Sequence, residues 1–331
     1  MVAYPGEPLQ TLPMTRQALI IDCDPGVDDA VALMLAFGSG ELDLLAITAV
    51  GGNVPVTKTA RNARMLRQIA GREDVPVFMG ADRPLRREPA GAGEFHGAEG
   101  LGDLTPREPD APCAEEHAAD AIIDRVMNRP GKSVAIAVLG PLTNVALALR
   151  KAPELAQRLG PVAVMGGARS EGGNITASAE FNIWADPEAA AEVLATGCDV
   201  VLFGLDATHQ VRATEARIAA LEAIGTPMAD TAASMMRFSE RVERRLVGWP
   251  SLPEWGPPVH DLCPVAWLLR PDLFALKPCR IEVETQSELT RGHTAVEFRQ
   301  GVAGALPHRW AVSADADGVF DLIAEACAPR G

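Results

Sequence analysis

The sequence predicts an α/β fold: a single domain built on an open, mostly parallel, twisted sheet flanked by helices. Short apolar strands alternate with helical segments along most of the 331 residues, which is typical of parallel βαβ units. Residues 18–21 form a continuous apolar run, as expected of a strand covered on both faces. Hydrophobic residues make up 47% of the chain and aromatic residues only 5%, so the core must consist mainly of Ala, Val, Leu and Ile.

Each expected strand is an apolar run that ends near Gly or Pro, and each expected helix repeats Ala, Leu or Ile every three or four residues. The first six strands are expected at residues 18–21, 42–50, 75–78, 133–139, 161–165 and 199–203. The helices between them are expected at residues 27–37, 58–70, 118–127, 143–151 and 187–195. Thr143 and Asp186 lie at the starts of two helices and are the expected N-caps, because short polar side chains accept hydrogen bonds from free N–H groups.

The remaining segments depart from this alternation. We expect residues 1–16 to form a flexible N-terminal tail and residues 17–331 one domain, since no linker divides them. A long segment rich in Gly, Pro and charge, at 80–113, and a polar loop at 168–182 interrupt the pattern. The later elements are expected as two helices within 213–245, broken near 225–227, a Pro- and Trp-rich stretch at 246–259, a helix at 261–269, strands at 280–284, 295–298 and 309–312, and a closing helix at 314–327.

Charge and cysteine content argue against several classes of partner. The chain has 30 basic and 44 acidic residues, a net charge of −14, which disfavours a nucleic-acid polymer. The cysteines show no metal-type spacing and no compact disulfide framework, and Cys23, Cys198 and Cys263 are expected to pack as small apolar side chains. With no secretory signal and no apolar run long enough for a membrane span, we expect no membrane partner and a cytoplasmic location.

The acidic turn after the first strand is the strongest chemical signal. Asp22, Asp24, Asp28 and Asp29 fall within eight residues at the carboxyl end of a strand, where open α/β sheets place their ligands. Carboxylates this close repel one another, and a hard divalent cation such as Ca²⁺, which prefers oxygen ligands, would relieve the repulsion. The alternative is that one Asp caps the following helix while the others are solvated.

Further polar residues follow other expected strands. Asn53, residues 139–144 and Met165 each come just after a strand, so they should meet the acidic turn at one edge of the sheet. Farther along, the segment 174–182 contains amide and carboxylate side chains that suit sugar hydroxyls: Asn174, Glu180 and Asn182. A solvated loop is the alternative for each of them.

His260 and Asp261 begin the helix at 261–269; read alone, Asp261 is an N-cap and His260 a surface residue. Together with residues 22–30, however, they resemble motifs of the inosine-uridine-type nucleoside hydrolases. The other motifs of that family recur in order across about residues 17–325: Gly51-Gly52-Asn53, His96-Gly97, Gly140-Pro141-Leu142-Thr143-Asn144, Val164-Met165-Gly166-Gly167, Glu180-Phe181-Asn182, Asp186-Pro187-Glu188-Ala189-Ala190 and Gly204-Leu205-Asp206-Ala207-Thr208-His209. The resemblance implies a Rossmann-like nucleoside hydrolase fold and Ca²⁺-dependent hydrolysis of purine or pyrimidine ribonucleosides.

The resemblance also implies roles for individual residues. A single Ca²⁺ would be held by the carboxylates of Asp24, Asp29 and Asp261 and by the backbone carbonyl of Leu139, where a common family version has Thr. The ion would take the 2′- and 3′-hydroxyls of the ribose. The residues expected around the sugar are Asp28, Asn53, Asn174, Glu180 and Asn182, with Met165 packed under the ribose. The family commonly forms homodimers or homotetramers, so a homo-oligomer is expected.

The implied reaction cleaves the N-glycosidic bond through an oxocarbenium-like state. A calcium-held water would lose its proton to Asp24, the general base, and attack the face opposite the nucleobase, which inverts the anomeric carbon. The departing base must be neutralised. His260 is the expected proton donor, and His96, on its Gly-rich loop, is the second candidate.

The nucleobase site departs from the family pattern. Pyrimidine-active relatives often carry tyrosines around the base, but the one tyrosine here is Tyr4. Trp249 and Trp255 occupy the corresponding region, either stacking on the base or serving as lid or core residues. The segments 80–113 and 225–258 are expected to act as lids that order when nucleoside binds.

Two other functions fit parts of the sequence. One is a non-catalytic Ca²⁺-dependent protein that binds ribose or nucleosides, which the presence of both His260 and the acids disfavours. The other is a metal-dependent phosphohydrolase, since DxD turns also occur in that class. The chain has no phosphate-cradling Gly-Lys-Ser/Thr loop, and an acidic rim would repel phosphate.

Overall fold

The computed structural model describes residues 16–246, 248, 254–303, 305 and 307–329. The expected N-terminal tail therefore lies almost wholly outside the described residues. Within them, a nine-stranded sheet forms the centre of the molecule, in the order β3-β2-β1-β4-β5-β6-β9-β7-β8. The strands are β1 (Gln17–Cys23), β2 (Leu42–Ala49), β3 (Val77–Met79), β4 (Val134–Val138), β5 (Val162–Met165), β6 (Val200–Phe203), β7 (Phe274–Val283), β8 (Thr294–Glu297) and β9 (His308–Ala314).

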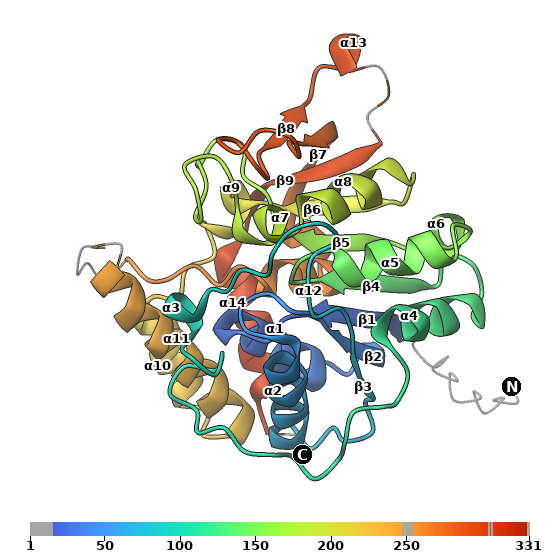
Figure 1. Cartoon of the computed structure of the whole chain (residues 1–331). Helices are drawn as coiled ribbons and strands as arrows, with labels where there is room; N and C mark the ends of the chain where they lie inside the picture. Colours follow the sequence, from blue (N-terminus) through green and yellow to red (C-terminus); the bar gives the residue numbers. More distant parts are fainter. Residues whose placement is uncertain (1–15, 247, 249–253, 304, 306, 330–331) are drawn as a thin grey trace, which may run out of the picture.

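Most of the sheet is parallel, as the sequence predicted. Strands β1 to β6 pair in parallel with their neighbours, and β9 joins β6 in parallel. Among the strands of the described residues, only β7 runs antiparallel, against both β9 and β8. Because β1, β2, β4 and β5 point the same way, the loops that follow them leave from one edge of the sheet (Figure 1).

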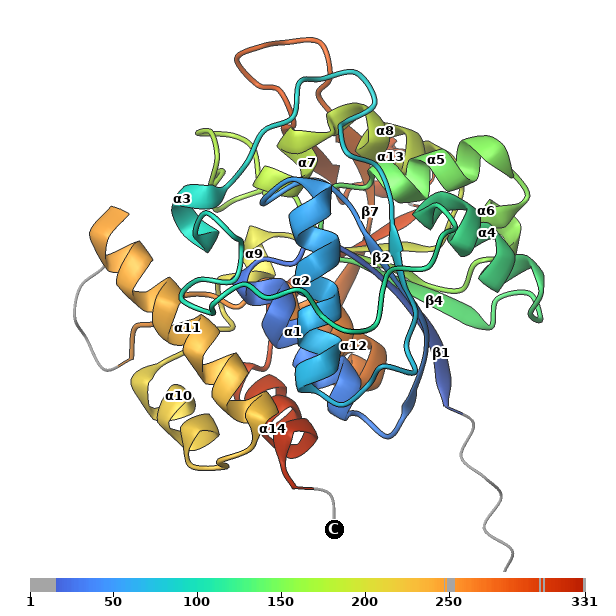
Figure 2. The ribbon, with the colours of Figure 1, turned by 60° about the horizontal axis from the view of Figure 1, so that its bottom comes forward.

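Helices cover both faces of the sheet (Figures 1 and 2). The helices are α1 (Val27–Gly38), α2 (Val56–Ile69), α3 (Gly93–His96), α4 (Ala118–Met127), α5 (Thr143–Lys151), α6 (Leu155–Arg158), α7 (Phe181–Ala185), α8 (Pro187–Ala195), α9 (Leu205–Thr208), α10 (Glu215–Glu222), α11 (Pro227–Leu246), α12 (Leu262–Leu269), α13 (Gln300–Ala303) and α14 (Ala316–Cys327), with one 3-10 turn, η1 (Pro271–Leu273). The α1 side carries α2, α11, α12 and α14, and the other side carries α4, α5 and α8.

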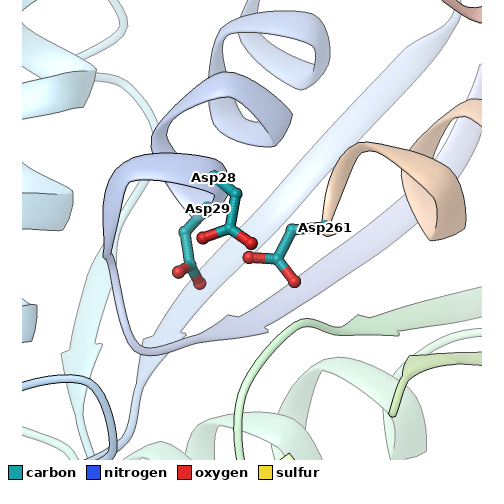
Figure 3. A group of neighbouring side chains, drawn as sticks. All are labelled: Asp28, Asp29 and Asp261. Atoms are coloured by element: carbon teal, nitrogen blue, oxygen red, sulfur yellow. The ribbon is translucent and has the colours of Figure 1, made fainter. Parts of the chain in front are cut away.

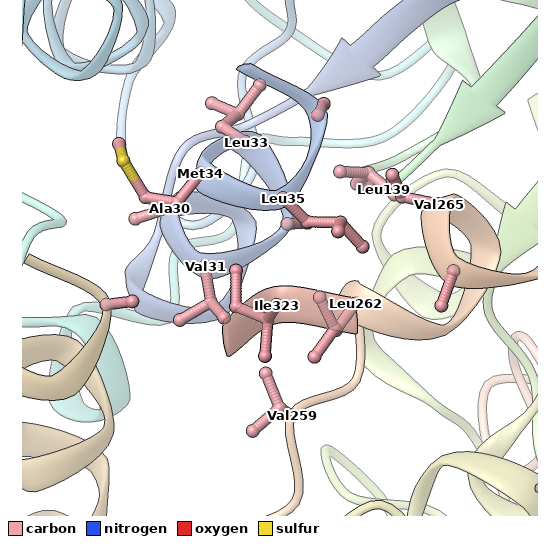
Figure 4. Packing of buried hydrophobic residues seen from close by; sticks show 14 of the residues in the cluster. Ala30, Val31, Leu33, Met34, Leu35, Leu139, Val259, Leu262, Val265 and Ile323 are labelled. Carbon is pink, nitrogen blue, oxygen red and sulfur yellow. The ribbon is translucent and has the colours of Figure 1, made fainter. Parts of the chain in front are cut away.

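Helix α1 is the centre of the first apolar layer. Its apolar residues are almost fully buried, including Val31 and Leu35, and they pack against Leu262 of α12 and Ile323 of α14 (Figure 4). This packing fixes the start of α1 relative to the start of α12. The acidic turn and Asp261 lie at these two helix starts, so the core of the protein positions the chemistry.

Several local expectations need correction. Strand β7 begins at Phe274, earlier than the expected residue 280, because its first residues pair with the end of β9. The expected polar loop 168–182 ends in a helix, α7, and the segment 80–113 contains the short helix α3. Thr143 does not cap α5: it is the first helical residue, and its hydroxyl donates to Asp186 Oδ2 at 2.7 Å.

Other expectations are confirmed. Asp186 caps α8, accepting a hydrogen bond from the Ala189 N–H at 3.0 Å. Cys23, Cys198 and Cys263 are buried and free. The described part of the chain contains no helix of the length and apolar character that a membrane crossing requires.

Candidate active site

A cavity of about 400 Å³ opens at the edge of the sheet where the parallel strands end. Its wall is formed by the loops after β1, β2, β4 and β5, by the segment around α3, and by one face of α11. Both segments expected to be lids, 80–113 and 225–258, thus contribute wall residues. The six polar or sulfur side chains expected around a ribose all line this cavity: Asp28, Asn53, Met165, Asn174, Glu180 and Asn182.

Three carboxylates converge beside this cavity. Asp28 and Asp29 lie in the first turn of α1, and Asp261 immediately precedes α12. Figure 3 shows the three side chains directed toward one another, and one oxygen from each lies within 4.8 Å of the others. The main-chain N–H groups of Gly26 and Asp24 hold Asp29 in place, at 2.9 Å and 3.2 Å from its two oxygens.

Asp24 is fully buried next to this cluster. Its Oδ2 accepts a hydrogen bond from the Asn53 N–H at 2.7 Å, while its Oδ1 has no hydrogen-bond partner among the described residues. Glycine is required on both sides, because a Cβ atom at Gly52 or Gly140 would overlap the Asp24 carboxylate. The Asp24 carboxylate is therefore held in one position, and its Oδ1 remains available to accept a hydrogen bond or bind an ion.

Burial and mutual repulsion of the carboxylates favour the binding of a cation at the cluster. Burial, together with the charge of Asp29, raises the pKa of Asp24 well above its usual value. Burial and the charge of Asp28 raise the pKa of Asp29 to about 7, and burial with the charges of Asp28 and Asp29 raises that of Asp261. No Lys or Arg of the described chain forms an ion pair with these acids. Buried carboxylates require compensation, and an oxygen-only donor set fits a hard divalent ion.

The structure brings two of the three expected carboxylate ligands into one group. Asp29 and Asp261 belong to the converging group, whereas Asp28, expected on the ribose, is also a member, and Asp24 lies beside it. The Leu139 carbonyl accepts a hydrogen bond from Asn182 Nδ2 at 2.7 Å, and Leu139 lines the cavity. These residues can hold a metal ion.

The sugar-type residues are fixed by hydrogen bonds to the backbone. Asn53 Nδ2 donates to the Asp24 carbonyl and to Asp29 Oδ2, each at 3.2 Å. Asn174 Oδ1 accepts from the Phe181 N–H at 2.9 Å. Glu180 caps α7 by accepting from two of its N–H groups and also accepts from the Gly167 N–H, while burial raises its pKa to about 7. Rigid side chains of this kind can orient a polar ligand without reorganising.

Both predicted proton donors line the cavity. The Val27 N–H donates to His96 Nδ1 at 3.1 Å, so the proton of the neutral ring resides on Nε2. His260 Nδ1 lies 2.7 Å from the Thr208 hydroxyl oxygen. Burial lowers the pKa of His96, and it lowers that of His260 to about 4. Both rings are therefore neutral at pH 7.

Of the two predicted tryptophans, the structure describes only Trp255. Trp249 lies outside the described residues. Trp255 is not among the residues that line the cavity, and the Arg212 guanidinium lies over its ring at 5.0 Å. Stacking of Trp255 on a nucleobase finds no support in this arrangement.

Sequence reasoning missed part of the wall. His209 lines the cavity, with its Nδ1 3.0 Å from Glu171 Oε2 and its ring 5.7 Å from that of His260. His209 ends the family motif at residues 204–209, so the sequence contained an indication that it lies near the site. Ser239 and Glu243 of α11 also line the cavity, and no motif marked them.

Carboxylates that converge at the ends of parallel strands, beside a cavity lined by fixed polar groups, are the arrangement of an α/β protein that binds a metal ion and a small polar ligand. The family model described as inosine-uridine preferring nucleoside hydrolase matches residues 19–321. The chain belongs to this family and is an enzyme of this kind.

Several known proteins are similar over nearly their whole length. The chain is 44% identical over 289 residues (87% of this chain and 91% of the relative) to an uncharacterized protein of Schizosaccharomyces pombe. It is 39% identical over 312 residues (93% and 97%) to the pyrimidine-specific ribonucleoside hydrolase RihA of Salmonella typhimurium. Among solved structures, a plant nucleoside hydrolase has a TM-score of 0.88 with 32% identity (95% and 99% covered). The purine-preferring ribonucleoside hydrolase from Gardnerella vaginalis has a TM-score of 0.86 with 30% identity (94% and 98%).

Proposed function

We propose that this protein hydrolyses the N-glycosidic bond of ribonucleosides to ribose and free base in a Ca²⁺-dependent reaction. The observation that carries the proposal is the group of Asp28, Asp29 and Asp261, whose oxygens lie within 4.8 Å of one another beside the cavity. Ca²⁺ takes six to eight oxygen ligands, and vicinal sugar hydroxyls can complete such a shell. The ribohydrolase names of the relatives support a ribonucleoside as the substrate.

The acids and the ion have separate tasks in this proposal. We assign Asp24, Asp29, Asp261 and the Leu139 carbonyl to the ion, and Asp28 with the neighbouring amides to the ribose. When bound, Ca²⁺ supplies a positive charge that holds the ribose hydroxyls and acidifies a water molecule. Asp24 accepts the proton of the attacking water, since its Oδ1 has no other partner among the described residues. Carboxylates around the sugar also favour the positive charge that develops on the ribose ring.

The histidines act on the departing base. His96 presents its Nε2–H because its Nδ1 is occupied by the Val27 N–H. The Thr208 hydroxyl can fix His260 in the same tautomer by donating to its Nδ1. A neutral imidazole donates a hydrogen bond from its Nε2–H to the base as negative charge develops on it, and the released base anion then takes its proton from water. Attack from the side opposite the base inverts the anomeric carbon.

Base release from inosine, uridine and a nucleotide, with and without a chelator, tests the proposal. Asp24→Ala should abolish release while circular dichroism shows an intact fold. Asp43→Asn, at the amino end of β2, removes an acid away from the cavity and should leave the rate unchanged. Wild-type rates in Asp24→Ala would overturn the general-base assignment. Binding without release would favour a sensor, and phosphate release from the nucleotide a phosphohydrolase.

Two expectations accompany this proposal. The family resemblance supports a homodimer or homotetramer, and the composition supports a cytoplasmic location. Sedimentation of the purified protein and localisation of a tagged copy would check them directly.

A further inference from the structure

One wall of the cavity carries no group with a role in the proposed reaction. Ser239, Val242 and Glu243 lie on α11 three and four positions apart, so they share one face, and this face lines the cavity. The sugar-type groups, in contrast, come from the strand-end loops, the first turn of α1 and α7. A nucleoside whose ribose occupies those groups must direct its base toward the remaining wall, where α11 and the histidines lie.

Glu243 has an unusual environment for a carboxylate. It is half-buried, and no hydrogen bond or ion pair reaches it from any described residue. Burial raises its pKa to about 7; the charge of Arg212 lowers it and that of Asp28 raises it. Glu240, three positions earlier, differs because Arg244 and Arg237 pair with it at 2.8 Å and 3.5 Å. A half-buried carboxylate that has no donor among the described residues can accept a hydrogen bond from the N–H of a ligand that enters the cavity.

We propose that Glu243 determines base specificity by accepting a hydrogen bond from the ring N–H of lactam bases such as uracil, hypoxanthine and guanine. This inference rests on the proposed nucleoside hydrolysis and names the class of base. An ionised carboxylate is only an acceptor. Uracil presents N3–H, and hypoxanthine and guanine present N1–H, on the edge away from the sugar. Cytosine and adenine present a ring nitrogen lone pair at the corresponding position, which the carboxylate repels.

Matched nucleosides and variants test this role. Base-release kcat/KM is measured at pH 8.5, where the carboxylate is ionised, for uridine, 3-methyluridine and cytidine, and for inosine, 1-methylinosine and adenosine. The wild type should prefer each lactam nucleoside over its methylated and amino counterparts by about tenfold or more, because a site that hydrogen-bonds a substrate group rejects analogues that lack it. In Glu243→Gln the uridine-to-cytidine ratio should fall about tenfold, since an amide can also donate.

The control is Glu240→Gln, which removes an ion-paired acid three positions earlier on the same helix and should leave the ratios at wild-type values. Glu243→Gln keeps the shape of the side chain and removes an unpaired charge, so its thermal midpoint should not fall. The assignment would be overturned if Glu243→Gln left the uridine-to-cytidine ratio of kcat/KM unchanged. It would also be overturned if the wild type cleaved the N-methylated nucleosides as efficiently as uridine and inosine. If the protein releases base from no nucleoside, the proposed hydrolysis is wrong, but the role of Glu243 in base recognition can still be tested by binding. Calorimetric affinities for the same nucleosides then decide the role of Glu243 by the same tenfold differences.

Discussion

Removal of the divalent ion should destabilise this protein more strongly as the pH rises. The reason is the buried acid cluster, whose folded-state pKa values lie above the unfolded values when no cation compensates them. In the metal-free protein, such a carboxyl group makes its full contribution to the stability of the folded state at pH values below its pKa in the unfolded chain. That contribution is lost as the pH rises from about 4 through the folded pKa. With the cation bound, the carboxylates are ionised and paired, so this loss does not occur.

Asp29 sets the scale of the effect. Its pKa rises from 3.8 to about 7, and the side chain is fully buried. At ~1.4 kcal/mol per pH unit, this carboxyl alone costs the metal-free protein about 4 kcal/mol at pH 8. At pH 5 the same carboxyl costs about 2 kcal/mol, so the difference between the two pH values is about 2–3 kcal/mol. Asp24 and Asp261 act in the same direction.

Thermal unfolding with Ca²⁺ or with a chelator, at pH 5, 6.5 and 8, measures this effect. The gap between the two midpoints should widen by roughly 5 °C or more from pH 5 to pH 8. Asp29→Asn should close the gap at every pH, and without calcium this variant should be more stable than the wild type at pH 8. A gap that stays constant with pH, or no gap, would refute the reasoning about the acid cluster.

Three further predictions concern catalysis. Gly52→Ala should lower kcat at least tenfold, because its Cβ overlaps the Asp24 carboxylate; an unchanged kcat would show that Asp24 has room to move. His260→Ala and His96→Ala should each lower kcat for uridine about 100-fold or more, yet cleave a nitrophenyl riboside nearly normally, since nitrophenolate departs without a proton. Equal losses of kcat on both substrates would show that the histidines do not assist departure of the base. Proton NMR of early product should show α-ribose from a β-nucleoside, and β-ribose would contradict inversion.

The sequence predicted the acidic side of the site because that side follows from the parallel sheet. Asp28, Asn53 and Asn182 follow or lie near the ends of strands that run the same way, so the topology brings them to one edge. The approach of Asp261 to this edge depends instead on the packing of α12 against α1, and only the family resemblance suggested it.

The opposite wall could not be predicted in the same way. Glu243 lies among several charged residues of an amphipathic helix, and in the sequence it does not differ from Glu240, which pairs with arginines instead of lining the cavity. Its position at the cavity depends on how α11 lies against α1 and α3, which local pattern does not encode. The occupation of His96 Nδ1 by the distant Val27 N–H likewise depends on tertiary structure.

The most direct test of the account titrates Ca²⁺ back into the chelated enzyme while base release from uridine or inosine and bound calcium are measured in the same samples. The account predicts a rate that is zero without the ion and rises in proportion to the filling of one site per chain. Asp261→Asn should bind no ion at that site and release no base. Full activity in a sample that contains no divalent metal would contradict the account.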